Sequence, residues 1–230
     1  MFKKTSLAAG VAAFAAVMFA GSYAIADANK AGKVDFTAMS AAELAEYIIL
    51  ESGGFHLDAA AQEGGTMRAR MEQDELQKAC SVVGGGKPDA ATLEAVRTAA
   101  AASITYPEGG IKLGDWQKGR ELSWSGFGYR VGHRNDEHSA NRQPGGNCAN
   151  CHQKVGDRDG GTLGPDLTGY GKMRGTSDAM LKYVYDVIYN AHAYFPCTQM
   201  PRMGAKGVLT QEQIADIMAW LLDPESPVTQ

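Results

Sequence analysis

Residues 148–152 read Cys148-Ala149-Asn150-Cys151-His152, which is a C-x-x-C-H motif. Two thiols three positions apart on one helical turn can each form a thioether to a haem vinyl group, and the next residue brings an imidazole under the iron. A C-x-x-C pair also occurs in redox dithiols and zinc sites, but the sequence has no second closely spaced cysteine pair and no βαβ pattern. The motif therefore predicts one covalently bound haem c, attached to Cys148 and Cys151, with His152 as an axial ligand.

Thirteen positions after His152, Pro165 stands in the stretch Gly164-Pro165-Asp166-Leu167-Thr168-Gly169. A metal-bound histidine normally donates its other ring N–H to an acceptor, which fixes the tautomer and strengthens the ligand. The carbonyl of a rigid proline suits that role, so we expect Pro165 to accept from His152. The alternative is an ordinary proline-glycine turn.

Met200 is the expected sixth ligand of the iron. It lies in a loop, residues 196–204, where Pro201 removes a backbone donor and stiffens the chain. A soft thioether ligand raises the reduction potential relative to a second histidine and leaves no open position on the iron. The alternatives are Met203, His192, His133 and Met173.

Residues 1–26 are typical of a cleaved signal peptide. Lys3 and Lys4 precede an apolar run over 7–20, and an A-x-A cleavage site follows at 24–26. A retained membrane anchor is the alternative, but the run is short for a span of about 20 residues. The sequence therefore predicts export, with the periplasm as the compartment.

Export bears on the two remaining cysteines, Cys80 and Cys197, because thiols do not persist in an oxidising compartment unless they are protected. An even pair predicts a disulfide, and a bridge across 117 positions stabilises by roughly 4 to 5 kcal/mol in the chain-entropy model. Such a bridge would brace the loop that presents Met200. The alternatives are a free reactive thiol at Cys197 or a catalytic thiol there that carries a persulfide.

The charge of the chain argues against two classes of partner. Without Lys3 and Lys4, the 22 basic side chains fall to 20 against 26 acidic ones, a net charge of −6. This balance gives no electrostatic footprint for nucleic acid or for an anionic membrane surface. We therefore expect protein partners, with neither nucleic acid nor membrane among them.

Helical signals occur along the whole mature chain, and no strand-length alternation interrupts them, so the predicted class is all-α. The expected division is a signal peptide at 1–26, a helical N-terminal extension at 27–110, and a haem domain at 111–230. The pattern predicts helices from a cap at Ser40 to Gly53-Gly54, over 67–83, 88–104, 115–125 and 177–191, and from Thr210 to Leu222.

The haem domain resembles the class I cytochrome c fold, with Gly119 and Trp220 where that family crosses its terminal helices; Trp124 belongs to the same first helix. More narrowly, four stretches resemble SoxX, the monohaem subunit of the SoxAX cytochrome of bacterial sulfur oxidation. They are Gly164-Pro165-Asp166-Leu167-Thr168-Gly169-Tyr170-Gly171, Met200-Pro201-Arg202-Met203-Gly204, Leu209-Thr210-x-x-Gln213-Ile214 and Leu221-Leu222-Asp223-Pro224-x-Ser226-Pro227-Val228.

This resemblance implies a periplasmic heterodimer with SoxA, which holds the catalytic haem and couples thiosulfate oxidatively to a cysteine of the carrier SoxYZ. The present chain would be the electron-transfer subunit of that L-cysteine S-thiosulfotransferase, with no catalytic acid, base or nucleophile. It would pass electrons to a small acceptor cytochrome c. The alternative is a freestanding soluble cytochrome c of another periplasmic redox chain.

Overall fold

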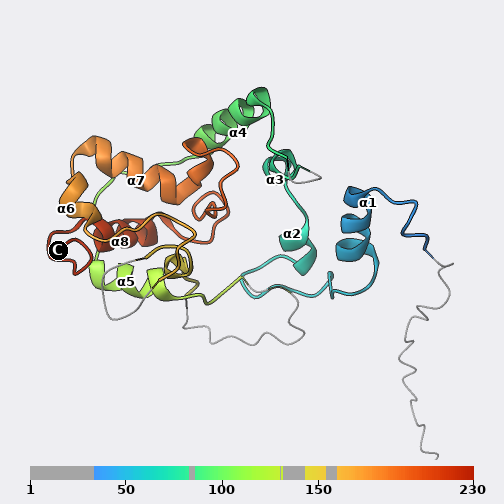
Figure 1. The fold of residues 1–230 in the computed structure, drawn as a ribbon. Coiled ribbons are helices and arrows are strands. Elements are labelled where there is room, and N and C mark those ends of the chain that lie inside the picture. Colours follow the sequence, from blue (N-terminus) through green and yellow to red (C-terminus); the bar gives the residue numbers. More distant parts are fainter. Residues whose placement is uncertain (1–33, 83–85, 130, 132–142, 154–159) are drawn as a thin grey trace, which may run out of the picture. The chain divides into compact units, whose positions relative to one another are not determined.

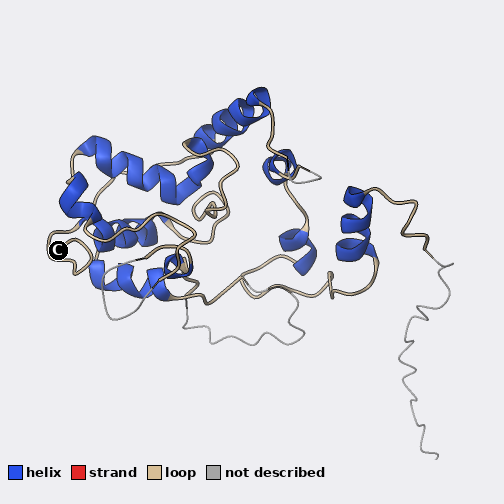
Figure 2. Cartoon of the chain, viewed as in Figure 1, coloured by secondary structure: helices blue, strands red, loops and turns tan. Residues whose placement is uncertain are grey.

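Figure 1 shows the computed structural model of the chain, which describes residues 34–82, 86–129, 131, 143–153 and 160–230. Within these ranges every regular element is a helix, and the single β contact is an isolated bridge between Ala60 and Thr66 (Figure 2). The predicted all-α class is confirmed. None of the helices in these ranges is both long and apolar enough to cross a membrane.

The chain divides into two units, residues 1–39 and 40–230, and each is described by itself. In the first, the Asp35 carboxylate accepts hydrogen bonds from the backbone N–H and the hydroxyl of Thr37. The second contains all the described helices. They are α1 (Ala41–Glu46), the π-helical turn η1 (Tyr47–Glu51), α2 (Met67–Met71), α3 (Glu75–Cys80), α4 (Ala90–Ala102), α5 (Trp116–Trp124), the 3₁₀ turn η2 (Cys148–Asn150), α6 (Tyr170–Arg174), α7 (Asp178–Asn190), the 3₁₀ turn η3 (Ala191–Ala193) and α8 (Gln211–Leu222).

The contact between α5 and α8 organises the second unit. Gly119 is buried in α5, and a Cβ atom there would overlap the backbone carbonyl of Asp216 in α8. Only glycine lets the two backbones approach this closely. Trp116 of α5 stacks on Trp220 of α8 with ring centroids 6.2 Å apart. The expected crossing of the terminal helices is therefore present.

The apolar stripe of α8 forms the centre of the core. Ile214, Ile217 and Met218 are almost completely buried against α7, which contributes Val184 and others. Burial of each such side chain favours folding by about 1.5 to 3 kcal/mol. The helical spacing that predicted α8 therefore also identified its buried face.

Residues 164–171 and 221–228 meet in space, although they are far apart in sequence. The Gly169 N–H donates to the carbonyl of Val228 over 2.7 Å, and the Ser226 hydroxyl donates to the carbonyl of Trp220 over 2.6 Å. Val228 and Ser226 are fully buried. These contacts close the C-terminal segment over the end of α8 and give its residues a packing role.

The α-helices of residues 40–102 begin at polar caps, of which the cap at Ser40 was predicted. Ser40 and Asp74 form capping boxes, and Thr66 and Asp89 accept a backbone hydrogen bond three residues on. These bonds satisfy N–H groups that have no partner within a helix.

One of the sequence predictions is wrong. The helix expected over 67–83 is interrupted, because Glu72 is extended and the Asp74 side chain caps a new helix, α3. A local cap therefore replaced the continuous helix that apolar spacing alone suggested. The structure also contains a short helix, α6, where no helix was predicted.

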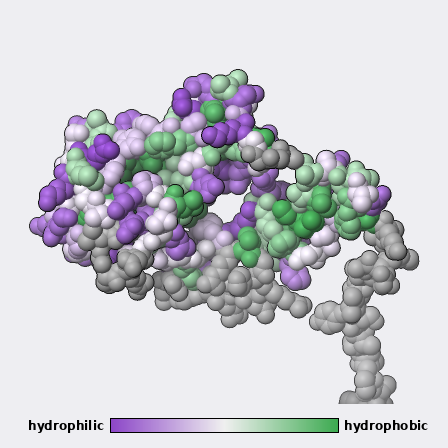
Figure 3. Space-filling view, in the orientation of Figure 1, coloured by the Kyte–Doolittle hydropathy of each residue, from purple (hydrophilic) through white to green (hydrophobic). Residues whose placement is uncertain are grey.

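Residues 40–82 contribute little to the apolar core. Neither α1 nor η1 has a buried residue, and Ile48 is 50% exposed. Figure 3 shows hydrophobic residues at the surface over this segment. Farther along, Glu63 pairs with Arg70 over 3.1 Å and accepts a hydrogen bond from the Tyr129 N–H over 2.8 Å. This segment is therefore attached to the rest of the unit mainly through polar side chains.

Candidate haem site

The C-x-x-C-H motif forms a single helical turn. Asn147 adopts a left-handed conformation (φ 49°) just before it, and the N–H groups of Cys151 and His152 both donate to the carbonyl of Cys148. Neither Cys148 nor Cys151 belongs to a disulfide, and both are half-buried. The two thiols and the imidazole therefore lie on one turn, as the attachment chemistry requires.

The loop over 160–164 packs closely against this turn. The N–H of Gly161 donates to the Ala149 carbonyl over 2.8 Å, and that of Gly164 donates to the Cys151 carbonyl over 2.7 Å. A Cβ atom at Gly164 would overlap the imidazole ring of His152. Glycine at this position therefore lets the chain pass directly against the proposed ligand. The sequence analysis missed this role, although the glycines at 160, 161 and 164 were a signal for it.

The orientation of His152 is set by Pro165. The Nδ1 atom of His152 lies 2.8 Å from the Pro165 carbonyl oxygen, which is the contact expected from the sequence. Because a carbonyl can only accept, Nδ1 carries the proton and donates. That tautomer leaves the Nε2 lone pair for a metal.

The burial of the two methionines in the 196–204 loop separates their roles. Met203 is 8% exposed and belongs to the apolar core with Val184 and Leu209. Met200 is only half-buried and lies at the edge of the same core. The core position gives Met203 a packing role, so Met200 is the better ligand candidate in this loop.

Met173 and His192 fit the role of sixth ligand less well than Met200. Met173 of α6 is 69% exposed. His192 is buried, and its Nδ1 accepts a hydrogen bond from the Cys197 N–H over 3.1 Å. Burial, assisted by the charge of Arg202, lowers the pKa of His192. His133 lies outside the described residues.

The disulfide between Cys80 and Cys197 is present, with Cα atoms 5.2 Å apart. Neither sulfur is therefore a free thiol in this structure, and neither a free reactive thiol nor a persulfide-bearing thiol at Cys197 is supported. Cys197 has a left-handed backbone (φ 59°) and stands three residues before Met200. The bridge thus links α3 directly to the loop that carries the candidate ligand.

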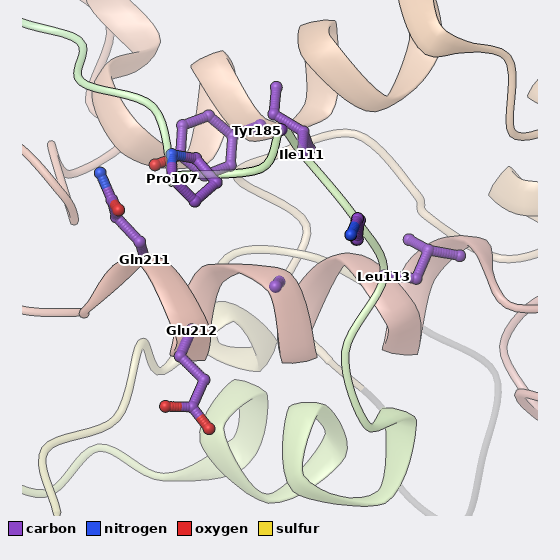
Figure 4. Close-up of a pocket in the computed structure, with 9 residues that line it drawn as sticks. Pro107, Ile111, Leu113, Tyr185, Gln211 and Glu212 are labelled. Atoms are coloured by element: carbon purple, nitrogen blue, oxygen red, sulfur yellow. The ribbon is translucent and has the colours of Figure 1, made fainter.

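A separate groove lies beside the first turn of α8 (Figure 4). Its lining includes Pro107, Ile111 and Leu113 of the segment before α5, with Tyr185 of α7 and Gln211 and Glu212 of α8. In Figure 4 Pro107 and Tyr185 lie close together, whereas Glu212 projects away from them. Among the described residues that line this groove there is no cysteine, histidine or methionine. It is therefore distinct from the candidate haem site.

The residues of the C-x-x-C-H turn fit a covalently attached haem. Cys148 and Cys151 would hold the porphyrin, and His152 has one nitrogen fixed by Pro165 and the other left for iron. This donor set of two unbridged thiols and an oriented imidazole is the chemistry that c-type attachment needs.

Comparison with known proteins agrees with this geometry. A family model described as cytochrome c matches residues 141–223, which include the C-x-x-C-H turn, Pro165, Met200 and α8. A protein of Aquifex aeolicus (strain VF5), described as an uncharacterized lipoprotein, is 38% identical over 166 residues, covering 71% of this chain and 76% of that protein. The chain contains a cytochrome c domain over residues 141–223.

This domain assigns the cofactor and the general role. The cytochrome carries covalently bound haem c and transfers electrons. Because c-type haem is attached after export, the cytochrome also works outside the cytoplasm. The all-α helices with the α5–α8 crossing are those of a class I cytochrome c.

Proposed function

We propose that this cytochrome is a monohaem electron carrier with His152 and Met200 as the axial ligands of its iron. The observation that carries this proposal is the 2.8 Å contact between His152 Nδ1 and the Pro165 carbonyl, next to two cysteines outside any disulfide. A bound haem c supplies a one-electron redox couple. The chain holds the imidazole in one tautomer and offers a soft sulfur from the 196–204 loop.

The spectrum and mass of the purified full-length protein test this assignment. The mass should exceed that of the polypeptide by one haem, and the ferric protein should show the sulfur-to-iron charge-transfer band of methionine ligation. Met200→Ala should abolish that band, whereas Met173→Leu at an exposed site should leave it intact. A colourless protein, or a mass accounted for by amino acids alone, would refute the proposal.

The more specific proposal is that the cytochrome is the electron-transfer subunit of a periplasmic SoxAX complex. Its support is the set of four stretches that resemble SoxX, together with the predicted signal peptide over 1–26. The relative from Aquifex aeolicus is described as a lipoprotein, which agrees with a location outside the cytoplasm. SoxA would be the stable partner, SoxYZ a transient one, and a small cytochrome c the acceptor.

In this role the cytochrome provides no catalytic acid, base or nucleophile. The oxidative coupling of thiosulfate to the carrier cysteine would take place on SoxA, and the cytochrome would accept the released electrons. Its contribution to the L-cysteine S-thiosulfotransferase reaction is therefore a redox centre of suitable potential. A methionine ligand suits that task, because it raises the potential relative to a second histidine.

Co-expression with SoxA separates this proposal from a freestanding carrier. The proposal expects a complex of two haem subunits on size exclusion, and reduction of this cytochrome when thiosulfate and SoxYZ are added to the complex. A Met173→Leu variant, changed at an exposed residue, should form the same complex and be reduced in the same way. If the cytochrome remains monomeric beside folded SoxA, the freestanding carrier is the better description.

A further inference from the structure

Helix α3 is attached at both ends to the loop that contains Met200. Cys80, its last residue, forms the disulfide with Cys197, three residues before Met200. At its other end, the Asp74 carboxylate lies 2.8 Å from Nη2 of Arg202, two residues after Met200. The same helix thus contacts the chain on both sides of the candidate ligand.

Asp74 uses its two carboxylate oxygens for different purposes. Oδ1 accepts from the Gln77 N–H over 2.9 Å and caps α3. Oδ2 binds Arg202 and also accepts from Nζ of Lys206 over 2.9 Å. The Arg202 side chain is only 11% exposed, so this pair is partly shielded from solvent and salt. One carboxylate therefore joins the start of α3 to two cations of the loop.

The two attachment points lie at opposite ends of α3. From Asp74 to Cys80 the helix rises by about 9 Å, at about 1.5 Å per residue. Between its ends runs a groove lined by Leu76, Gln77, His192 and Met200, among others. Met200 therefore faces α3 along the stretch between the two attachment points.

The other hydrogen bonds of the Met200 segment are mostly local. The N–H of Thr198 donates to the Phe195 carbonyl and that of Met200 to the Thr198 hydroxyl. Bonds to the rest of the unit lie on either side of the ligand, from the Cys197 N–H to Nδ1 of His192 in η3 and from the Gly204 N–H to the Tyr189 carbonyl of α7. Helix α3 therefore shares the restraint of residues 197–202 with η3 and α7.

We propose that α3 is a positioning element for the axial methionine, with Asp74 as an ionic attachment and Cys80 as a covalent one. This inference rests on the proposed ligation of the iron by Met200. Both attachments lower the number of conformations open to residues 197–202 when the thioether leaves the iron. Loss of either one makes Met200 easier to displace.

Asp74→Asn tests the ionic attachment without removing the helix cap. Asparagine caps helices about as well as aspartate, but it cannot pair with Arg202 and Lys206 as a charge. The matched control is Asp89→Asn, which makes the same substitution at the cap of α4. The probe is imidazole, titrated against the ferric full-length holoprotein while the sulfur-to-iron band is followed.

We expect Asp74→Asn to raise the apparent affinity for imidazole about three- to tenfold, whereas Asp89→Asn leaves it unchanged. In the wild type, added salt should raise the affinity by screening mainly the Asp74–Lys206 pair, because Lys206 is more exposed than Arg202, and this dependence should shrink in Asp74→Asn. The double variant Cys80→Ser/Cys197→Ser should raise the affinity further. Helix content by circular dichroism checks that each variant is folded.

The outcomes distinguish this inference from the proposed function. If the wild type shows no sulfur-to-iron band, the ligation by Met200 is wrong and the proposed function fails at that point. If the wild type shows the band but Asp74→Asn and the folded cysteine variant bind imidazole as the wild type does, α3 has no positioning role. An effect of equal size in Asp89→Asn would also overturn the inference.

Discussion

The core around α5, α7 and α8 and the segment over residues 40–82 are held in place by different interactions. In the core, large apolar side chains such as Ile214, Ile217 and Trp220 are almost fully buried. In the segment, Ile48 and Phe55 remain 50% and 37% exposed. The described attachments of the segment to the rest of the unit include a disulfide, the ion pairs of Asp74, and the hydrogen bond from the Tyr129 N–H to Glu63.

This difference shows that one kind of interaction stabilises the fold and another fixes the positions of its short helices. Buried apolar area supplies most of the folding free energy, but it is non-directional. Disulfides and ion pairs join particular atoms, and they determine where a short helix such as α3 lies. The molecule thus has a core that stabilises the fold and an attached segment that restrains one loop.

The largest effect should come from the crossing of α5 and α8. An added methyl group in Gly119→Ala overlaps a backbone carbonyl of α8, which no side-chain rotation can relieve. We expect a loss of about 5 kcal/mol in the free energy of unfolding, or failure to fold. Urea unfolding measures this loss.

Gly54→Ala, in the segment over residues 40–82, is the control. An added methyl group there makes only ordinary contacts, so the free energy of unfolding should change by less than about 0.5 kcal/mol. Similar losses at Gly119 and Gly54 would contradict the difference between the core and the segment.

Removal of the disulfide should have the next largest effect. Cys80 and Cys197 are separated by 117 positions, so Cys80→Ser/Cys197→Ser should destabilise the chain by about 4 kcal/mol in the chain-entropy model. Limited proteolysis of the folded variant should show faster cleavage near α3 than in α8. Equal protection of α3 in both proteins would show that its apolar contacts alone hold it.

A third test compares two isoleucines. Ile217→Ala in the core should cost about 3 kcal/mol, because it leaves a cavity in a packed interior. Ile48→Ala at the exposed site of η1 should change the free energy of unfolding by less than about 0.5 kcal/mol. A cost at Ile48 near that of Ile217 would indicate that the segment is covered in solution.

The smallest effect concerns the pH dependence of the Asp74 ion pairs. Partial burial acts to raise the pKa of Asp74, but the hydrogen bonds from Gln77, Lys206 and Arg202 outweigh it and lower the value to about 2. Because the folded pKa lies below the ordinary value of 3.8, the stabilisation is complete above about pH 5. It is lost as the pH falls from about 4 towards 2.

The measurement is the difference in unfolding free energy between the wild type and Asp74→Asn as a function of pH. Solvent screening limits this difference in unfolding free energy to about 1 kcal/mol at pH 7, and the difference should shrink on acidification. His192 also lies near Asp74, whose charge acts to raise the pKa of His192, so protonation of His192 contributes to this difference as well. A difference that is constant from pH 7 to pH 3 would contradict the role of the ion pairs.

The helices were predictable where a cap and an apolar period agree. Thr210 and the spacing of Ile214, Ile217 and Leu221 identified α8 and its buried face, and both are confirmed. The break between α2 and α3 was missed, because Asp74 is a polar residue that can lie within a helix or cap one. Which of these it does here depends on Gln77 and on two cations more than 120 positions away.

The candidate site shows the same division. The C-x-x-C-H turn was predictable, because its chemistry depends on five adjacent residues, and a rigid proline thirteen positions on suggested the partner of His152. The sequence already favoured Met200 over Met203, from its place in the loop before Pro201. The packing of Met203 into the core adds an independent reason for the same ranking.

Contacts between residues that are close in sequence follow from the amino-acid order: the haem-attachment turn, the helix caps and the apolar faces. The pairing of Cys80 with Cys197 could also be predicted, because no other cysteine remains outside the motif. The meeting of other distant groups, such as Asp74 with Arg202 and Gly119 with Asp216, depends on the folded structure. Short-range patterns depend on backbone geometry over a few residues, whereas long-range contacts depend on how the whole core packs, and the type of a residue does not identify its distant partner.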